Sequence, residues 1–476
     1  MGKSPLIGRE NERKRLQKFL SSPRSEFLAI YGRRRVGKTF LVKEFFQYTF
    51  DFYISGLANA STAQQLFNFD TEMVRQSHLV YDAPSKNWLE AFQRLRGHLE
   101  AKKEAGKRVI FIDELPWFDT YGSDFMIALE HFWNAWATNR KDILLITCGS
   151  AASWMLNELI NNSGGLHNRV TGQIKMAPFT LQESELLLKA RNCVFDRYQI
   201  VQLYMCMGGI PYYLDGIEPG LSAAQNIQAL FFENGGLLRQ EFQNLYRSLF
   251  KRHDIYEKVV EALSAKKYGM PRSEIIRMAK IASGGTLTKV LADLEESGFI
   301  SAYPSLDGKQ KNMLYRLSDY YTSFYFNFLE ASKRRISTSW LQLFDQPAQR
   351  VWQGFTFEQL CMDHIWQVKK ALGINGIEAT IATWAGSTQE RGAQIDLLID
   401  RRDHVVNLCE CKFSLDVYTI TKSYAETLKS KIAVFREVSS TKKAIQTVFI
   451  TTYGVARNAY SDMLVQHQVL LDDLFE

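Results

Sequence analysis

The segment Gly32–Thr39 constrains the fold of this chain more than any other stretch of its sequence. Its residues, GRRRVGKT, fit the pattern G-x-x-x-x-G-K-[ST], and they lie between the apolar run Phe27–Tyr31 and the amphipathic run Phe40–Phe46. In such a strand–loop–helix unit, successive backbone N–H groups and the helix N-terminus form a concave anion site. We therefore expect a buried strand, a phosphate-binding loop and a helix in this order.

The residues of this loop have separate expected tasks. Gly32 and Gly37 permit backbone conformations, and a close approach of phosphate, that a Cβ would hinder. Lys38 would reach the β- and γ-phosphates, and Thr39 would supply a hydroxyl oxygen to Mg²⁺. The motif thus predicts ATP and Mg²⁺ as cofactors, with the nucleotide bound by Gly32, Arg33, Arg34, Arg35, Val36, Gly37, Lys38 and Thr39.

Three further apolar runs in the first third of the chain, each followed by a polar loop, are Phe52–Ile54, Val109–Ile112 and Ile143–Ile146. Consecutive apolar residues indicate strands buried on both faces, which is typical of a parallel sheet covered by helices. The intervening segments Trp88–Ala105 and Ser123–Asn139 are long enough for the crossover helices that parallel strands require. The pattern predicts an α/β fold, a P-loop NTPase with a parallel sheet, over residues 1–178.

Two carboxylates, Asp113 and Glu114, directly follow the second of these runs in a Walker B arrangement. Asp113 would hold Mg²⁺, directly or through water, and Glu114 would orient and polarise the attacking water. After the next strand, Thr147 or Ser150 would contact the γ-phosphate or that water, unless it is an ordinary strand-end hydroxyl. Arg169 is a candidate arginine finger or sensor, the alternative being a solvated surface arginine.

Two more motifs accompany the Walker pair. The segment Leu6–Glu10 reads LIGRE, and Met207–Leu214 reads MGGIPYYL, with a G-x-P block at Gly209–Pro211. Together with the Walker motifs, they resemble the archaeal and bacterial STAND-type, AAA-like P-loop ATPases. The resemblance covers most of the chain.

This resemblance implies a switch ATPase that uses hydrolysis to reset its state. Gly8 and Arg9 would then lie near adenine, and Pro211 would belong to a helical lid over residues 179–250 that senses the nucleotide. Members of the family often carry a restriction-enzyme-like C-terminal domain.

Residues 251–335 have the proportions of a winged helix, with helices expected over Ile255–Leu263, Pro271–Met278 and Thr286–Ser297 and a wing turn at Asp307–Asn312. Basic residues nearby would neutralise DNA phosphates; they are Lys266, Lys267, Arg272, Lys289, Lys309 and Lys311. The third helix offers few side chains for reading base edges and includes acidic ones. The module therefore either contacts DNA or packs internally as part of a switch.

Residues 336–476 contain a carboxylate–lysine pattern. The runs Gln394–Asp400 and Val405–Lys412 predict neighbouring strands, and alternation places Glu410 and Lys412 on one face. A hairpin would bring Asp396 beside them. Two carboxylates and a lysine are suited to metal-assisted phosphodiester hydrolysis, although Glu and Lys two residues apart are often only a solvated face.

The pattern resembles the PD-(D/E)XK nuclease motif, with Asp396 as its Asp and Glu410-Cys411-Lys412 as its E-x-K. The resemblance implies an α/β restriction-endonuclease-like domain in which Glu358 is the additional acidic residue, on a helix expected over Phe355–Val368. Glu358, Asp396 and Glu410 would hold the metal, and Asp396, Glu410 and Lys412 would be catalytic.

Charge and composition narrow the function classes. The chain has 58 Lys+Arg against 51 Asp+Glu; residues 341–476 carry a net charge of −2 and the preceding residues +9. DNA, a polyanion, would therefore be held by the ATPase and winged-helix parts. The chain lacks an apolar stretch of roughly 20 residues and a secretory leader, and its six cysteines show no paired spacing. We expect a cytoplasmic protein without a membrane span, disulfide framework or structural zinc.

These observations lead to one main functional hypothesis and one alternative. The main hypothesis is a Mg-ATP-hydrolysing, STAND-like switch ATPase coupled to a DNA-directed nuclease-like domain. The alternative is an ATP-switched DNA-binding or protein-interaction regulator whose nuclease-like fold does not cut. A homo-oligomer or a protein partner is compatible with both.

Overall fold

The computed structural model describes residues 6–78, 83–102, 106–161, 168–250, 252–304, 313–330 and 339–476. The chain divides into two compact units. The first comprises Met1–Pro178 and Leu291–Gly298, and the second comprises Phe179–Val290 and Phe299–Glu476. Each unit is described separately.

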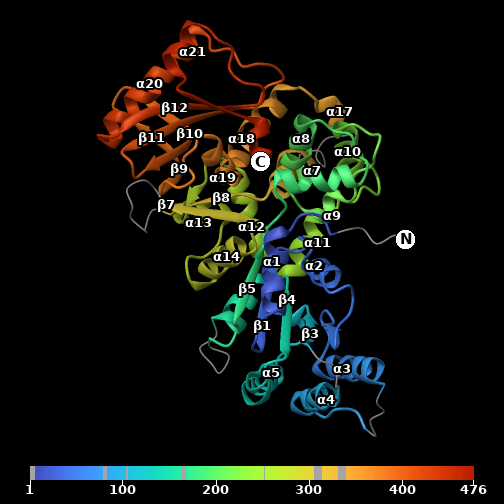
Figure 1. Ribbon diagram of the computed structural model, residues 1–476. Helices are drawn as coiled ribbons and strands as arrows, with labels where there is room; N and C mark the ends of the chain where they lie inside the picture. The colour runs from blue at the N-terminus through green and yellow to red at the C-terminus, as the bar shows by residue number, and fades with distance from the viewer. Residues whose placement is uncertain are drawn as a thin grey trace. The chain divides into compact units, whose positions relative to one another are not determined.

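The first unit is built on a five-stranded parallel sheet (Figure 1). Its strands are β1 (Glu26–Gly32), β2 (Phe52–Ser55), β3 (Arg108–Asp113), β4 (Ile143–Gly149) and β5 (Gly172–Met176), in the order β2-β3-β4-β1-β5. All residues of β1, β3 and β4 are buried. The predicted parallel sheet is confirmed, because strands buried on both faces need apolar residues at consecutive positions.

Aromatic rings contribute to the packing of the helices of the first unit on this sheet. The helical segments are α1 (Glu10–Leu20), α2 (Lys38–Phe45), α3 (Thr62–Ser77), α4 (Trp88–Ala101), η1 (Leu115–Trp117), α5 (Phe125–His131), η2 (Phe132–Trp136), η3 (Ala137–Asn139), α6 (Ala152–Trp154) and η4 (Met155–Ile160). Phe27 of β1 packs on Trp133, with ring centroids 5.0 Å apart, and Phe52 of β2 packs on Phe69 of α3 at 5.1 Å. Trp88 of α4 is completely buried.

The second unit begins with short helices. They are α7 (Leu181–Ala190), α8 (Arg197–Met207), α9 (Pro211–Leu214), α10 (Ala223–Ile227), η5 (Gln228–Phe232) and α11 (Glu241–Leu249). The Gly209 backbone contacts that of Phe179, whose N–H donates to the Gly209 carbonyl at 2.6 Å. A Cβ on Gly209 would lie 1.9 Å from the Phe179 carbonyl oxygen, so only glycine allows this approach.

Three helices and a small antiparallel sheet follow. The elements are α12 (His253–Ser264), β6 (Met270–Pro271), α13 (Arg272–Ala279), α14 (Gly285–Glu296), β7 (Ile300–Pro304) and β8 (Met313–Leu317), with strand order β6-β8-β7. The part of α14 from Leu291 onward belongs to the first unit. The expected wing turn Asp307–Asn312 lies outside the described residues. The observed order of elements is the expected one, and the assignment as a winged helix stays a prediction.

A helical connection then leads to a second five-stranded sheet. The helical segments are α15 (Tyr320–Phe324), η7 (Tyr325–Leu329), α17 (Trp340–Leu343), α18 (Pro347–Asp363) and α19 (Ile365–Ala371). The single helix expected over Phe355–Val368 is wrong at both ends. α18 already starts at Pro347 and ends at Asp363, and His364 separates it from α19, which starts at Ile365.

The second sheet is mixed rather than parallel. Its elements are β9 (Ala379–Ser387), β10 (Gly392–Arg401), β11 (Val405–Lys412), α20 (Lys422–Ser439), β12 (Ala444–Thr451), α21 (Ala459–Leu464), β13 (His467–Leu470) and η8 (Leu471–Phe475). In the order β13-β12-β11-β10-β9, the strands β9, β10 and β11 pair antiparallel, and β11, β12 and β13 pair parallel. The hairpin expected between the two motif strands is present as β10 and β11.

Helices that combine the length and apolar character needed to cross a membrane are absent from the part of the chain that the structure describes.

Candidate functional site: a phosphate-binding loop with a Walker B carboxylate pair

The loop between β1 and α2 depends on two glycines. Gly32, at the end of β1, has φ +140°, and a Cβ there would lie 2.4 Å from the carbonyl oxygen of Met176 on β5. Gly37 has φ +91° and caps the N-terminus of α2. Backbone N–H groups at a helix start, with no Cβ in the way, form the cradle that a phosphate requires. These residues fit a bound nucleotide.

Lys38 follows the helix cap, and its side chain is folded into the loop. Its Nζ donates to the carbonyl oxygens of Gly32 and Arg33, both at 2.9 Å. Burial lowers the pKa of Lys38, and the nearby charge of Glu114 opposes this effect. The ammonium group is therefore held inside the loop, where a β- or γ-phosphate would attract it.

Thr39 and Asp113 come together although they are 74 residues apart in sequence. The Thr39 hydroxyl lies 3.0 and 2.9 Å from the two carboxylate oxygens of Asp113 at the end of β3. Burial raises the pKa of Asp113 to about 6, against the opposing effect of the Thr39 hydrogen bond. A buried carboxylate beside a hydroxyl is a donor set of hard oxygens, which fits Mg²⁺.

Glu114 is held by Ser150, which follows the neighbouring strand β4. The Glu114 Oε2 accepts from the Ser150 hydroxyl at 2.9 Å and from its backbone N–H at 3.3 Å. The other candidate hydroxyl, Thr147, is fully buried and lies 3.4 Å from the Leu28 carbonyl oxygen within the sheet. Ser150 thus contacts the carboxylate expected to polarise water, and Thr147 lies away from it.

Arg9, which belongs to the N-terminal motif, is hydrogen-bonded to the phosphate-binding loop. It is buried, and its guanidinium Nη2 donates to the carbonyl oxygen of Val36 at 3.0 Å. Gly8 before it has φ +64°, a conformation that glycine adopts readily. Within the loop, Arg33 is buried, Arg35 is half-buried with φ +71°, and Arg34 is exposed. The contact of Arg9 with Val36 was not evident from the sequence.

The carboxylates and the lysine of the second sequence motif also lie close together in the structure. Glu410 on β11 is buried and accepts from Lys431 Nζ at 2.6 Å, the Tyr424 hydroxyl at 2.6 Å and Lys412 Nζ at 3.3 Å. The charges of the two lysines lower the pKa of Glu410, against the effect of its burial. Asp396 lies on the adjacent strand and accepts from the Cys411 N–H at 2.9 Å.

Glu358, on α18, is the third carboxylate of this cluster. It is buried, and its Oε2 has no hydrogen-bond partner among the described residues. Burial and then the charge of Asp396 raise the pKa of Glu358 to about 8, and burial followed by the charge of Glu410 raises that of Asp396 to about 6. Glu358 and Asp396 are thus near each other, and the charges of Arg316 and Lys412 only partly oppose the rise in the pKa of Glu358.

The expected three-carboxylate metal set needs a correction. Within the described ranges, no group of three or more His, Cys, Asp or Glu side chains is arranged to hold a metal ion. The physical reason is the engagement of Glu410, because Lys431 and Lys412 already neutralise its carboxylate.

A known family resembles the first unit and the start of the second. Residues 6–217 match the family model described as an ATPase domain predominantly from Archaea. This match covers both Walker motifs, whose side chains meet at the loop described above. The chain carries an ATPase domain.

One relative and two solved structures also resemble this chain, with sequence identities of 24% or less. The uncharacterized protein MJECL04 of Methanocaldococcus jannaschii is 24% identical over 409 residues, which are 83% of this chain and 84% of the relative. The Walker-type ATPase PABY2304 of Pyrococcus abyssi is 18% identical with a TM-score of 0.49, over 69% of this chain and 99% of that structure. Cdc6p from Pyrobaculum aerophilum is 14% identical with a TM-score of 0.33, over 69% and 95%. Similarity at this level does not identify a substrate or partner.

Arg169 lies in the first unit near the start of β5. It is exposed and precedes β5, whose first residue, Gly172, pairs with Leu28, whereas the loop begins at Gly32, level with Met176. At about 3.3 Å per strand residue, four residues along β1 span roughly 13 Å. Arg169 thus lies toward the opposite end of the strands from the loop, and its role as an arginine finger or sensor stays a prediction.

Pro211, the remaining expected nucleotide contact, belongs to the second unit. It is the first residue of α9, where its fixed φ suits a helix start. The nucleotide-sensing role of the G-x-P block stays a prediction.

Tyr424 and Lys431 are the contacts of the second cluster that the sequence reading missed. They lie seven residues apart on α20, which is two helical turns, so both face β11 from one side of the helix. This spacing after an E-x-K strand would have been the available signal. Tyr268 and Lys267 were also missed as neighbours: the charge of Glu358 acts on both, and Tyr268 bonds to Gln394 on β10.

Proposed function

We propose that this protein is a Mg-ATP-dependent, STAND-like switch ATPase whose nucleotide state controls a DNA-directed, nuclease-like C-terminal domain. The observation that carries the first half is the contact between Thr39 and Asp113, which joins the two Walker motifs into one site. The second half rests on the register of β10 and β11, which puts Asp396 beside Glu410 and Lys412.

Each residue of the ATPase site would have a defined task. Lys38 would leave the loop carbonyls to bind the β- and γ-phosphates, and Thr39 and Asp113 would hold Mg²⁺. When bound, the ion supplies positive charge to the phosphate oxygens. Glu114 would accept a hydrogen bond from the attacking water, and Ser150 would keep its Oε2 in place.

ATP hydrolysis and binding test this site. Lys38→Ala should weaken ATP binding by at least about tenfold, because it removes a cation from the phosphate cradle. Glu114→Gln should keep binding and lower the turnover rate by about 10²-fold or more. Unchanged ATP binding in Lys38→Ala would show that the nucleotide site has been assigned to the wrong residues. Exchange of the exposed Lys14 of α1 for Ala is a matched control.

The C-terminal domain would act on the phosphodiester backbone of DNA. Glu358 and Asp396 are the carboxylates suited to hold Mg²⁺, which when bound stabilises negative charge on phosphate. Lys412 would position the water. The net charge of −2 over residues 341–476 supports anchoring of DNA by the more basic residues that precede them.

Nicking of supercoiled DNA tests this assignment. Asp396→Ala and Lys412→Ala should abolish nicking in Mg²⁺, and EDTA should abolish it in the wild type. The assay needs ATP, a non-hydrolysable analogue and no nucleotide as separate conditions, because the domain is proposed to be switched. Nicking that persists in both variants would mean that the activity comes from elsewhere.

The second candidate function is a regulator whose nuclease-like domain does not cut DNA. The ion pairs and the hydrogen bond that Glu410 already makes favour this candidate. A carboxylate held by two lysines and a tyrosine hydroxyl is a stable buried network by itself. DNA binding that depends on ATP, with no nicking under any of the three conditions, would support this candidate over the first. A protein partner or a second copy of the chain would then be the target of the switch.

A further inference from the structure

Glu358 of the carboxylate cluster lies on a face of α18 that a cation from another element contacts. Arg316 of β8 donates at 3.4 Å to the Phe355 carbonyl oxygen and at 3.7 Å to the Met362 sulfur. Phe355 and Met362 are seven residues apart, which is two helical turns, and Glu358 lies between them on the same face. The buried guanidinium of Arg316 therefore lies along the face of α18 that carries Glu358.

The turn Lys266–Gly269, which joins α12 to β6 and is called the α12–β6 turn below, contacts the same helix. The Lys267 Nζ lies 3.8 Å from the centre of the Phe355 ring. The Tyr268 ring packs T-shaped against that ring, with centroids 5.3 Å apart. Because Phe355 precedes Glu358 by three residues, two consecutive side chains of the α12–β6 turn contact α18 one helical turn before this carboxylate.

Tyr268 also connects the α12–β6 turn to the strand of Asp396. Its side chain bonds to Gln394 on β10, which precedes Asp396 by two residues. Burial, followed by the charges of Glu358 and Asp396, raises the pKa of Tyr268. The phenol is therefore close to two of the three carboxylates.

The small sheet fixes the position of the α12–β6 turn. Gly269 has φ +81°, and a Cβ there would lie 2.8 Å from the Tyr315 carbonyl oxygen of β8. The Tyr303 hydroxyl of β7 donates to the Tyr268 carbonyl oxygen at 2.5 Å. The turn is thus joined to the small sheet, and a displacement of this sheet would carry Lys267 away from α18.

Lys267 and Arg316 both interact with the charge of Glu358. Burial and then the charge of Asp396 raise the pKa of Glu358 to about 8, and the charge of Arg316 opposes this rise. Burial lowers the pKa of Lys267, and the charge of Glu358 opposes that effect. The two cations therefore supply Glu358 with positive charge from outside the carboxylate cluster.

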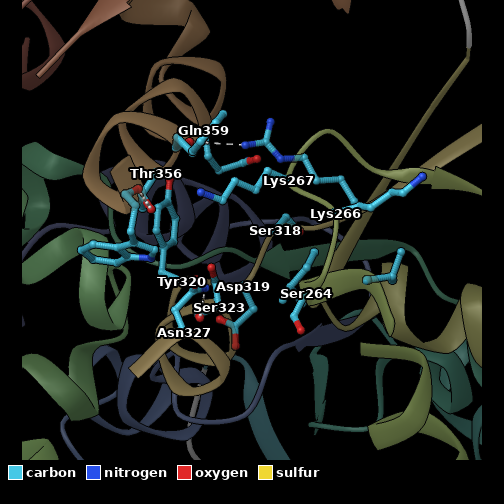
Figure 2. A pocket seen from close by; sticks show the side chains of 15 residues that line it. Ser264, Lys266, Lys267, Ser318, Asp319, Tyr320, Ser323, Asn327, Thr356 and Gln359 are labelled. Atoms are coloured by element: carbon cyan, nitrogen blue, oxygen red, sulfur yellow. Dashed lines mark hydrogen bonds between the residues drawn. The ribbon is translucent and has the colours of Figure 1, made fainter. Parts of the chain in front are cut away.

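Lys266, the residue before Lys267, provides a contrast. It is exposed and is paired with Glu274 at 2.8 Å. Figure 2 shows Lys267 extending toward Thr356 of α18 and Lys266 pointing away from it. The two lysines are adjacent in sequence, but only Lys267 is directed at the helix that carries Glu358.

We propose that Lys267, together with Arg316, is an intramolecular counter-charge for Glu358 that keeps a divalent cation out of the carboxylate cluster. A cation between Glu358 and Asp396 would be repelled by the two positive charges beside it. The α12–β6 turn is thus an autoinhibitory contact, and metal binding requires that the turn withdraws from α18. This inference rests on the proposed function, because it concerns regulation of the metal site in the nuclease-like domain.

Binding of Mn²⁺ to the full-length protein without nucleotide, measured by electron paramagnetic resonance, tests this contact. In each protein, the binding of interest is the part that Asp396→Asn removes, so that Mn²⁺ at the ATP site is not counted. Lys267→Gln should bind this Mn²⁺ about fivefold more tightly or better, because a charge that repels the ion is absent. Lys267→Met keeps the aliphatic stem over Phe355 and should show the same gain.

Two variants serve as controls. Lys267→Arg keeps the positive charge and should stay within about twofold of the wild type. Lys266→Gln removes the neighbouring charge that points away from α18, and it should also stay within about twofold.

The outcomes separate this contact from the nuclease activity. A gain in both neutral variants of Lys267 that Asp396→Asn removes supports the proposal, whether or not the protein nicks DNA. Equal Asp396-dependent binding by Lys267→Gln and Lys266→Gln, or an equal gain in Lys267→Arg, would overturn the proposal and leave the metal site of the proposed function intact. Absence of Asp396-dependent binding from every protein would overturn both.

Discussion

The hydroxyl oxygen of Thr39 lies 3.0 and 2.9 Å from the two carboxylate oxygens of Asp113. The two residues come from motifs 74 positions apart, and their contact brings the first residues of α2 to the end of β3. Hard oxygen donors so placed should make nucleotide binding depend on Mg²⁺.

Replacement of Thr39 by alanine tests this dependence. In the presence of Mg²⁺, we expect Thr39→Ala to bind ATP about tenfold more weakly, which corresponds to about 1.4 kcal/mol. In the presence of EDTA, its affinity for ATP should differ little from that of the wild type. Thr39→Ser keeps the hydroxyl and should stay within about threefold of the wild type. Calorimetry with and without Mg²⁺ measures both, and an equal loss under the two conditions would contradict the role of Thr39 as a metal ligand.

Ser150 is expected to act through Glu114. Ser150→Ala removes the 2.9 Å hydrogen bond to Oε2 and should lower kcat about tenfold, because a displaced carboxylate orients water poorly. The affinity for ATP should change less than twofold. Thr147→Val, at a hydroxyl directed to Leu28, is the matched control and should keep kcat. A larger effect on ATP affinity than on kcat would assign Ser150 to phosphate binding instead.

Gly209 is expected to tolerate no side chain. Gly209→Ala would place its Cβ 1.9 Å from the Phe179 carbonyl oxygen, and we expect a loss of at least about 2 kcal/mol in the free energy of unfolding. Gly354→Ala in α18 meets no atom within 4 Å and should instead stabilise by about 0.5–1 kcal/mol. Chemical denaturation of both variants provides the measurement, and similar midpoints would mean that the backbones of Phe179 and Gly209 are not in contact.

His364 should make stability depend on pH. Its Nε2 accepts from the Leu181 N–H at 3.1 Å, its Nδ1 lies 3.0 Å from the Leu360 carbonyl oxygen, and burial lowers its pKa to about 4. The unfolded chain, with a histidine pKa near 6.5, binds more protons between about pH 4 and 6.5. Stability from neutral His364 is therefore present above this window and is lost as the pH falls through it.

The size of this effect can be measured against His364→Gln. Between pH 7.5 and pH 5, the free energy of unfolding of the wild type relative to the variant should fall by about 2 kcal/mol. Each pH unit below the unfolded pKa and above the folded pKa costs about 1.36 kcal/mol. Burial raises the pKa of the adjacent Asp363 to about 6, but this group is present in both proteins and its effect largely cancels. Urea unfolding at the two pH values would contradict the expectation if the advantage stayed constant.

Much of the first unit follows from sequence. The runs that predict its strands are apolar at every position, and the Walker patterns have few other uses at that spacing, so the sheet, loop and carboxylate pair could all be inferred. Arg169 could not be placed in the same way. A surface arginine before a strand has no local signal that tells which end of the sheet it will occupy, and the pairing of Gly172 with Leu28 decides this.

The carboxylate cluster of the second unit was also predictable from the sequence only in part. Alternation along β11 was enough to put Glu410 and Lys412 on one face, because side chains on a strand alternate with a period of two. The sequence alone could not show that Lys431 and Tyr424 of α20 reach the same carboxylate, because that contact depends on how a helix packs on the sheet.

By itself, then, the sequence determined the local units of this protein: the phosphate loop, the Walker B strand, the G-x-P turn and the E-x-K strand. Each depends on backbone conformations or side-chain periods that a short segment specifies alone. Only the tertiary structure decided which groups are neutralised and which are left without a partner. Glu410 is paired, whereas Glu358 Oε2 and the Trp352 N–H have no partner among the described residues. Burial and distance set these relationships, and both arise from packing between segments far apart in the chain.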